Sequence, residues 1–474
     1  MISAISNKQA TIKTLRYSFL AFAYLALIII LSIGYGLTPT IFSIFVLIAA
    51  IFILPSHGLG FGLIILLTMT MERFFTLTPL VIGGTVYKLY LLDITIGLTA
   101  LALIIASIKK RTSGFKLNWP EVILLIWVGF NIFSFSQSLL SQGTDFAVAF
   151  STLKNYTFYP LLYFLTKYSI SSAKQLKNYS HLFFLGGLLI IPFIVIGIIS
   201  GQGLWTEFTP LSTVGFRLLA GTHAYYLCIA TIFATSLLVF KKFWNTPIVV
   251  SVILIWLFGI AGSLMRHLWI ALLIALTSLF ILLPTKEKLT IKQNRKKIFW
   301  VTISVIAVLA LVISLMPNYY LPENISSISN RLTSFTNITQ DSSANWRIQF
   351  WQSAYDKWQN QFLLGTGLGQ NITISIDNWQ TVEEIRSIHN SHLSIIIQTG
   401  IIGFSIFIAS IISIIVYNFK AGINNLKLKP YYLAIIATLV MILVATTFQP
   451  HLETNLTGIF FWILLGMLST PKKI

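Results

Sequence analysis

Apolar runs close to helix-spanning length recur from one end of the chain to the other, and short polar segments separate them. A membrane helix needs roughly 20 mostly apolar residues, and a bilayer requires every backbone polar group to be bonded within the protein. We therefore predict an all-α fold, a polytopic bundle of about 12–14 transmembrane helices. The predicted spans are 17–35, 37–54, 58–71, 89–108, 120–140, 156–169, 181–200, 222–240, 247–262, 267–283, 298–316, 391–417, 431–447 and 455–469.

One polar segment, residues 317–388, is much longer than the others and is rich in aromatic side chains, unlike a disordered linker. Between Asn345 and Phe362 the apolar residues recur every three or four positions. This pattern predicts an amphipathic helix with Ser342 or Ser343 as its N-cap. Its aromatic residues suit a helix that lies at the outer face of the membrane. We thus predict an N-terminal bundle of about 11 spans at 1–316, the large outer loop at 317–388, and C-terminal spans at 389–474.

The charges of the chain indicate its topology. The sequence is 56% hydrophobic and 9% charged, with a net charge of +19. If the N-terminus is cytoplasmic, most Lys and Arg residues fall in cytoplasmic segments and most Asp and Glu residues fall outside, as the positive-inside rule expects. Both termini are then cytoplasmic. The net charge therefore reflects orientation, and nucleic-acid binding is not predicted. The single cysteine, Cys228, excludes an internal disulfide.

The basic residues expected on the outer side are mostly Arg, whereas those inside are mostly Lys. An Arg fork grips phosphate or carboxylate oxygens through two hydrogen bonds, so these residues suggest an anionic ligand. Arg217 precedes a span, Arg266 follows Ser263 in a tight turn between two spans, and Arg347 lies on the amphipathic helix. A charge held near hydrocarbon is a candidate functional group. The alternative for Arg266 is that its side chain simply reaches back to the interface.

Glycines mark a turn in the outer loop, Gly365-Thr366-Gly367-Leu368-Gly369. We interpret this cluster as a tight turn that folds the loop back. The alternative is a phosphate cradle made of backbone N–H groups. No βαβ pattern surrounds it, which excludes a nucleotide-binding P-loop.

A polar end precedes the span at 391–417. His389 and Asn390 fall at its water-facing end, and Gly400 and Gly403 lie deeper, at a spacing that lets another helix approach closely. His389 and His392 are one helical turn apart, which could hold a metal if other ligands came close in space. The simplest alternative is an ordinary membrane helix with a polar cap.

The His389 stretch completes a known motif. It reads His389-Asn390, then nine residues, Gly400, two residues and Gly403. With it, and with Arg347, Trp351 and the glycine turn upstream, the chain resembles the bacterial O-antigen ligase/polymerase family over roughly residues 217–403. Two residues separate Ser263 from Arg266 in this chain, whereas the family commonly has Ser and Arg adjacent.

The resemblance implies a GT-C-like membrane glycosyltransferase that uses a glycan carried on polyprenyl diphosphate, with no nucleotide sugar, metal or other cofactor. It implies a bacterial inner-membrane protein with its active site on the periplasmic face, in contact with membrane lipids. The acceptor would be another lipid-linked glycan (a polymerase) or the lipid A core (a ligase). Proteins of polysaccharide export or chain-length control could be further partners.

The residue chemistry is compatible with this activity. A glycosyl diphosphate already has a good leaving group, so the reaction needs positive charge at the diphosphate and one base for the acceptor hydroxyl. His389 suits the base, Arg266 and Arg347 suit the diphosphate, and Arg217 is a third contact. One base without a covalent nucleophile predicts inversion at the anomeric carbon. The alternative function is a transporter of an anion or a lipid-linked sugar.

Overall fold

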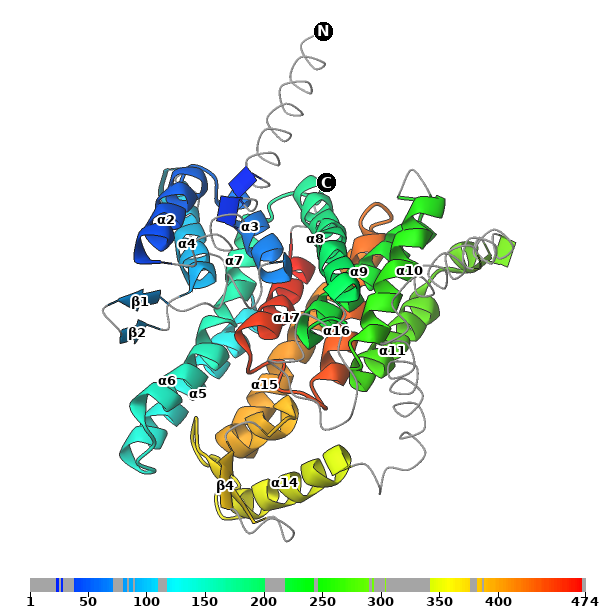
Figure 1. Cartoon of the computed structure of the whole chain (residues 1–474). Helices are drawn as coiled ribbons and strands as arrows, with labels where there is room; N and C mark the ends of the chain where they lie inside the picture. The colour runs from blue at the N-terminus through cyan, green and yellow to red at the C-terminus, as the bar shows by residue number, and fades with distance from the viewer. Residues whose placement is uncertain are drawn as a thin grey trace. The chain divides into compact units, whose positions relative to one another are not determined.

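The structure is a computed structural model that describes residues 23–24, 27–28, 38–70, 80–82, 85–87, 90–109, 117–200, 218–242, 246–289, 292–293, 303, 342–375, 382–385 and 388–470. Over these residues the chain is helical, with two small hairpins (Figure 1). This confirms the predicted all-α polytopic class. Within the described part, five helices are long and apolar enough to cross a membrane.

The five long helices are α4 (Leu91–Lys109), α5 (Trp119–Leu140), α8 (Ala173–Ser200), α9 (Gly221–Val239) and α15 (Ser391–Asn424). Shorter apolar helices are α2 (Pro39–Ile53), α3 (His57–Thr70), α10 (Thr246–Gly262), α11 (Arg266–Leu282), α16 (Lys429–Ala445) and α17 (Asn455–Leu468). Each coincides with a predicted span to within a few residues, apart from α8 and α15, which extend further at one end. The predicted spans 17–35 and 298–316 lie largely outside the described residues, so the total count stays a prediction.

The predicted span at 156–169 is not one regular helix. Helix α6 (Phe146–Leu153) runs into a π-helical turn, η2 (Lys154–Phe158), and α7 (Leu161–Ser169) begins after Pro160. Proline has no N–H to donate and its ring crowds the preceding turn, which explains the interruption. The prediction of a continuous span there is therefore wrong.

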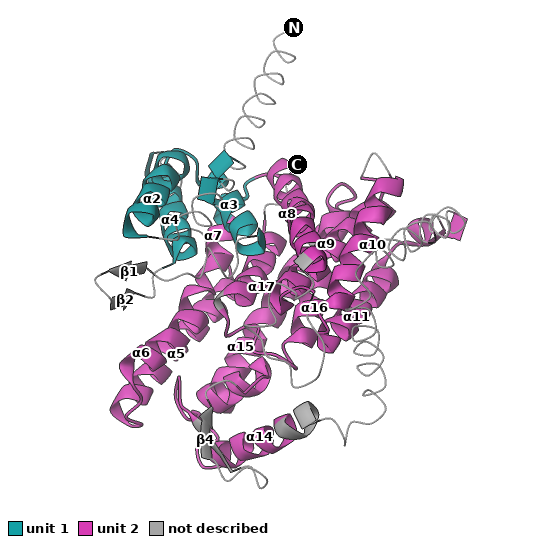
Figure 2. Ribbon diagram, in the orientation of Figure 1, with its two compact units in different colours: residues 1–116, 168–171 teal, residues 117–167, 172–474 magenta. Residues whose placement is uncertain are grey.

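The chain divides into two compact units (Figure 2). Unit 1, residues 1–116 and 168–171, contains α2, α3 and α4. Its α3 and α4 approach closely at Gly60, where a Cβ would lie 2.3 Å from the Thr99 hydroxyl oxygen. The strands β1 (Leu80–Ile82) and β2 (Thr85–Tyr87) pair antiparallel in the same sequence region. Glycine permits the close α3–α4 packing because any side chain would displace Thr99.

Unit 2, residues 117–167 and 172–474, contains the remaining helices, including the candidate site. Its centre is formed by α9 and α16, which are buried on almost every side. A helix that is apolar all round is expected in such a position. The predicted domain division at residues 316 and 388 stays a prediction.

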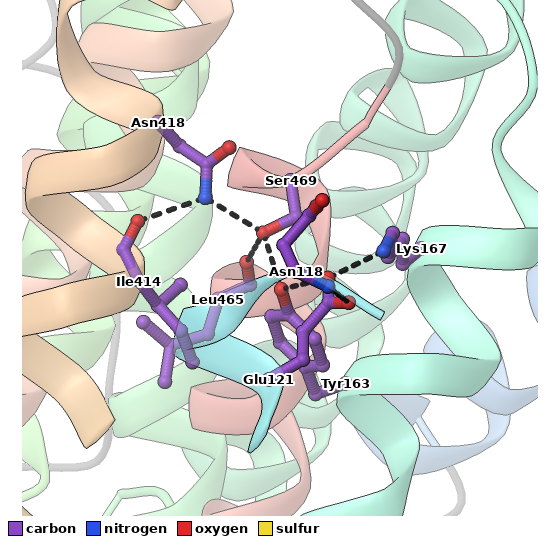
Figure 3. Close-up of polar contacts among 8 residues, drawn as sticks. All are labelled: Asn118, Glu121, Tyr163, Lys167, Ile414, Asn418, Leu465 and Ser469. Atoms are coloured by element: carbon purple, nitrogen blue, oxygen red, sulfur yellow. Dashed lines mark hydrogen bonds and ion pairs between the residues drawn. The ribbon is translucent and has the colours of Figure 1, made fainter. Parts of the chain in front are cut away.

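A buried polar cluster joins four helices near the last turns of α15 (Figure 3). Glu121, in the capping box that starts α5, forms an ion pair with Lys167, and the Tyr163 hydroxyl lies 3.0 Å from its Oε1. The same hydroxyl lies 2.7 Å from Ser469 Oγ, which also accepts a hydrogen bond of 2.9 Å from Asn418. A buried carboxylate is tolerated only when it is paired and hydrogen-bonded. This cluster therefore fixes α5, α7, α15 and the end of α17 to one another.

Candidate functional site

The amphipathic helix of the outer loop is present as α14 (Ser342–Gln359) and lies across the start of α15 (Figure 1). It begins at Ser342, so both predicted cap residues, Ser342 and Ser343, lie inside the helix, and the N-cap prediction is wrong. Phe350 and Ala354 pack against Ile388 and Ile397 in a buried cluster. Trp351 adds a polar link, because its indole N–H donates to the Ile388 carbonyl at 3.0 Å. Helix α14 thus holds the residue that precedes His389.

The glycine turn has three residues in the left-handed region, Gly365, Gly367 and Gly369, with φ of 78°, 84° and 80°. Its four central amides all have protein acceptors. The Thr366 N–H donates to Ile397 O (2.8 Å), Gly367 N–H to Gln398 O (3.1 Å), Leu368 N–H to Ser138 Oγ, and Gly369 N–H to Gln398 Oε1 (3.0 Å). Since none of these donors is left for a phosphate, the turn is structural, and the phosphate-cradle alternative is wrong.

Helix α15 is broken at Gly400, where φ is 66° and ψ is −177°. The break exposes backbone groups on both sides, and the outer loop binds them. On the C-terminal side of the break, the Ile401 and Ile402 N–H groups donate to Phe362 O (3.1 Å) and Leu363 O (3.3 Å). A Cβ at Gly400 would lie 2.1 Å from that Leu363 oxygen. The close neighbour at Gly400 is therefore the outer loop rather than the helix we predicted.

Gly403 lies where α15 approaches α5. A Cβ there would lie 2.6 Å from Cε1 of Phe130, which belongs to α5. The two motif glycines thus have different roles. Gly400 provides a backbone conformation that other residues rarely adopt, and Gly403 provides space.

His389 lies immediately before the α15 N-cap, Asn390, whose side chain accepts the Leu393 N–H at 3.1 Å. His389 itself has φ of 53°, an uncommon conformation for a residue with a Cβ, and such residues often occur at functional sites. Its imidazole is half-buried, and Nδ1 lies 3.3 Å from the Gln449 side-chain oxygen in the loop between α16 and α17. Gln449 was not identified from the sequence.

The surroundings of His389 favour a neutral imidazole. Burial lowers its pKa below the ordinary value of 6.5, the Gln449 hydrogen bond opposes this effect, and the positive charge of Arg347 lowers the pKa further. With Gln449 Oε1 as acceptor, a neutral His389 carries its proton on Nδ1, and Nε2 is the unprotonated nitrogen. Arg347, half-buried on α14, is thus close enough to His389 to influence its charge.

His392 has different partners and does not converge with His389. Its Nε2 lies 3.1 Å from Leu443 O and 2.9 Å from Thr446 Oγ1, at the end of α16. Because Thr446 donates its own hydroxyl proton to Leu443 O, Nε2 of His392 is the donor to both oxygens. In the described part of the chain, no three His, Cys, Asp or Glu side chains group as metal ligands. His392 therefore ties α15 to α16.

Arg266 is the first residue of α11, just after a turn in which Leu264 has φ of 56°. The turn is braced by Ser263, which accepts the Met265 N–H at 3.3 Å and donates to Ile260 O. Arg217 lies outside the described residues. Its neighbour Leu218 donates its N–H to Gly262 O at 2.9 Å, so the chain following Arg217 reaches the turn that contains Arg266.

The loop that follows α16, residues 446–454, connects these parts. On one side Gln449 contacts His389, and on the other side His451 contacts His267, the residue next to Arg266. This loop has only a weak signal in the sequence, namely polar Gln449 and His451 within a short segment between two apolar runs. What the sequence could not indicate was that they face His389 and His267.

The O-antigen ligase family model matches residues 249–408. The matched region contains α10, α11, α14, the glycine turn, His389 and the broken first half of α15. It does not include Arg217, Gln449 or His451. No curated protein matches this sequence.

Proposed function

We propose that this chain is an inverting membrane glycosyltransferase of the O-antigen ligase/polymerase family, and the family match at residues 249–408 supports this proposal. The donor would be a glycan on a polyprenyl (undecaprenyl) diphosphate carrier, and the acceptor a hydroxyl group of another glycan or of the lipid A core. The observation that carries the proposal is the environment of His389. It is a half-buried imidazole with its Nδ1 on Gln449 and a guanidinium nearby.

In this mechanism Nε2 of His389 removes the proton of the acceptor hydroxyl as that oxygen attacks the anomeric carbon. The bond between the anomeric carbon and the diphosphate oxygen breaks, and both bonding electrons leave with the diphosphate. The lowered pKa of His389 keeps the imidazole unprotonated and ready at neutral pH. One displacement with no covalent intermediate inverts the anomeric configuration.

The departing diphosphate needs positive charge that is in place before the bond breaks. Arg347 and Arg266 are proposed to provide it, with Arg217 as a further contact. Arg347 is held on a helix whose Trp351 is bonded to Ile388, so its position relative to His389 is fixed by packing. The turn that presents Arg266 is connected to the same histidine through the 446–454 loop.

The proposed site lies on the periplasmic face of the inner membrane, with both termini in the cytoplasm. Reporter fusions test this orientation. A fusion after Ser327 should report periplasm, and fusions after Lys292 and Asn424 should report cytoplasm. A cytoplasmic signal at Ser327 would contradict the proposed mechanism, because the lipid-linked donor would then lie on the wrong side.

Transfer by purified protein, with a defined lipid-linked donor, tests the activity directly. His389→Asn should lose about two to four orders of magnitude in rate, the usual contribution of a positioned general base. Asn tolerates the left-handed backbone at this position, so the variant should fold and insert. The matched control is His181→Asn on α8, where Nδ1 of the imidazole lies 2.6 Å from the Lys177 carbonyl of its own helix and the ring contacts Tyr431 of α16. Wild-type transfer by His389→Asn would refute the assignment.

A strain lacking the protein distinguishes the two acceptors. If long surface chains are lost but one repeat unit stays attached, the protein is a polymerase. If all attached repeats are lost while glycan accumulates on its lipid carrier, the protein is a ligase. An unchanged glycan profile would contradict both forms of the proposal.

A further inference from the structure

Two buried imidazoles meet on the side of the 446–454 loop that faces away from His389. His267 is the second residue of α11 and His451 lies within the loop, and their Nε2 atoms are 3.4 Å apart. Both side chains are almost completely shielded from solvent. Burial lowers the pKa of His451 to about 3, so this ring is neutral at physiological pH.

The rings meet tip to tip. The ring centroids are 5.6 Å apart and the Nε2 atoms are 3.4 Å apart. The difference of 2.2 Å is about twice the distance from the centre of an imidazole to one of its nitrogens, so the two Nε2 atoms point toward each other. In this arrangement one Nε2 must carry a proton and the other a lone pair, because two N–H groups or two lone pairs would repel. The contact is therefore a directional N–H···N bond that forms only when both rings are aligned. A misaligned pair would leave two buried polar groups unpaired, which costs free energy.

The loop that carries His451 is hydrogen-bonded to the N-terminal end of α15, next to His389. Ser391, two residues after His389, donates its backbone N–H to Thr446 O at 2.8 Å, and its hydroxyl accepts the Leu452 N–H at 3.1 Å. The His451 ring also stacks on Tyr225 of α9, with centroids 4.8 Å apart. Any shift of His451 is thereby passed to Gln449, which is only two residues away and contacts His389.

We propose that His267 and His451 are a pair of positioning residues that sets the register between the turn bearing Arg266 and the imidazole of His389. They do not touch the substrate. Their hydrogen bond joins α11 to the 446–454 loop, whose Gln449 orients His389. The guanidinium of Arg266 and the imidazole of His389 are thereby kept at a fixed separation. The inference rests on the proposed function for its meaning in catalysis, but its structural content can be measured without substrate.

The first measurement is the titration of His389 in the full-length protein. Diethyl pyrocarbonate modifies neutral imidazoles, and mass spectrometry of the His389 peptide at several pH values gives the midpoint. In His267→Leu and in His451→Leu, we expect that midpoint to rise by about half a unit or more toward the ordinary value. The loosened loop would expose the ring to water, while Arg347 of α14 is unchanged in all variants. His181→Leu is the control and should not move the midpoint.

The second measurement is transfer. Each single Leu variant should lose about tenfold in kcat with KM nearly unchanged, since it removes alignment rather than binding. His267→Gln should recover part of this loss, because an amide can also donate to or accept from His451. A purely structural pair would instead lower thermal stability without moving the His389 midpoint.

The outcomes separate the two proposals. If wild-type protein transfers glycan but the midpoint is unchanged in folded His267→Leu and His451→Leu, the positioning inference is wrong and the proposed function stands. If the midpoint moves but no transfer occurs from any lipid-linked donor, the positioning inference stands and the proposed function fails. Should a Leu variant not fold, the Phe variant at the same position, which keeps a planar ring without a donor or acceptor, decides the matter by the same criterion.

Discussion

Replacing Gln449 with glutamate would test how strongly the neighbour of His389 controls the base. In the wild type His389 must be neutral to accept a proton, and burial holds its pKa below 6.5. The rate of transfer should therefore be constant near neutral pH and fall only as the pH drops through that lowered pKa. Gln449→Glu keeps the shape of the side chain but places a negative charge where the amide oxygen lies 3.3 Å from Nδ1.

The size of the effect follows from this distance. Two opposite charges about 4 Å apart interact by about 4 kcal/mol near a protein surface. Half-exposure of the imidazole and the nearby positive charge of Arg347 reduce that figure, so we expect about 1.5–3 kcal/mol. One pKa unit corresponds to about 1.4 kcal/mol, so the pKa of His389 should rise by one to two units. The sign is fixed, because a carboxylate stabilises the imidazolium.

The assay is a profile of kcat/KM against pH with a defined lipid-linked donor. The acid limb of Gln449→Glu should lie about one to two units above that of the wild type, with the two rates converging at high pH. Gln449→Met, which removes the hydrogen bond without adding charge, should move the limb slightly in the opposite direction. An acid limb in the same place in Gln449→Glu and wild type would refute the assignment of His389 as the base.

Three further predictions concern other parts of the site. Gly400→Ala should lower the unfolding temperature by about 2–6 °C, because about 1–3 kcal/mol of backbone strain adds to a similar cost of lost hydrogen bonds to the outer loop. Gly129→Ala on α5, where a Cβ meets nothing within 4 Å, should leave the temperature nearly unchanged, and equal effects would contradict the role of Gly400. Arg347→Lys should keep part of the transfer rate and Arg347→Ala should lose most of it, whereas Lys357→Gln on the same helix should have little effect. His392→Ala should lower thermal stability by about 1–3 kcal/mol without moving the pH profile, and a shifted profile would place His392 in the reaction.

Much of the fold could be predicted because membrane helices are encoded by local composition. Apolar length alone located α9 and α16, and the spacing of aromatic residues located α14. The errors occurred where local patterns compete. Ser342 reads as a cap, yet the structure places it within the helix, and the apolar run at 156–169 hides the effect of Pro160 on the helix. The hairpin of β3 (Ile372–Ser375) and β4 (Val382–Ile385) was also missed, because four alternating residues are a weak signal.

The candidate site was only half visible in the sequence. The motif indicated His389, Asn390, Gly400 and Gly403, but their partners depend on contacts between distant segments. Gln449 is 60 residues from His389, and a glutamine between two apolar spans has no distinctive pattern. The different roles of the two glycines were likewise invisible, since both residue spacings are compatible with helix packing.

The broken helix α15 has a consequence for evolution and engineering. Phe362, Leu363 and the glycine turn bind the backbone groups that the break at Gly400 leaves open, and the Leu368 N–H donates to Ser138 of α5. The outer loop therefore cannot be exchanged independently of α5 and α15. A chimera that exchanges it with the loop of another protein that matches the same family model must carry residues 362–369 together with residues 397–402 and Ser138 from one parent. Junctions that separate these segments would leave buried amides and carbonyls unpaired, so substrate range should evolve elsewhere on the loop.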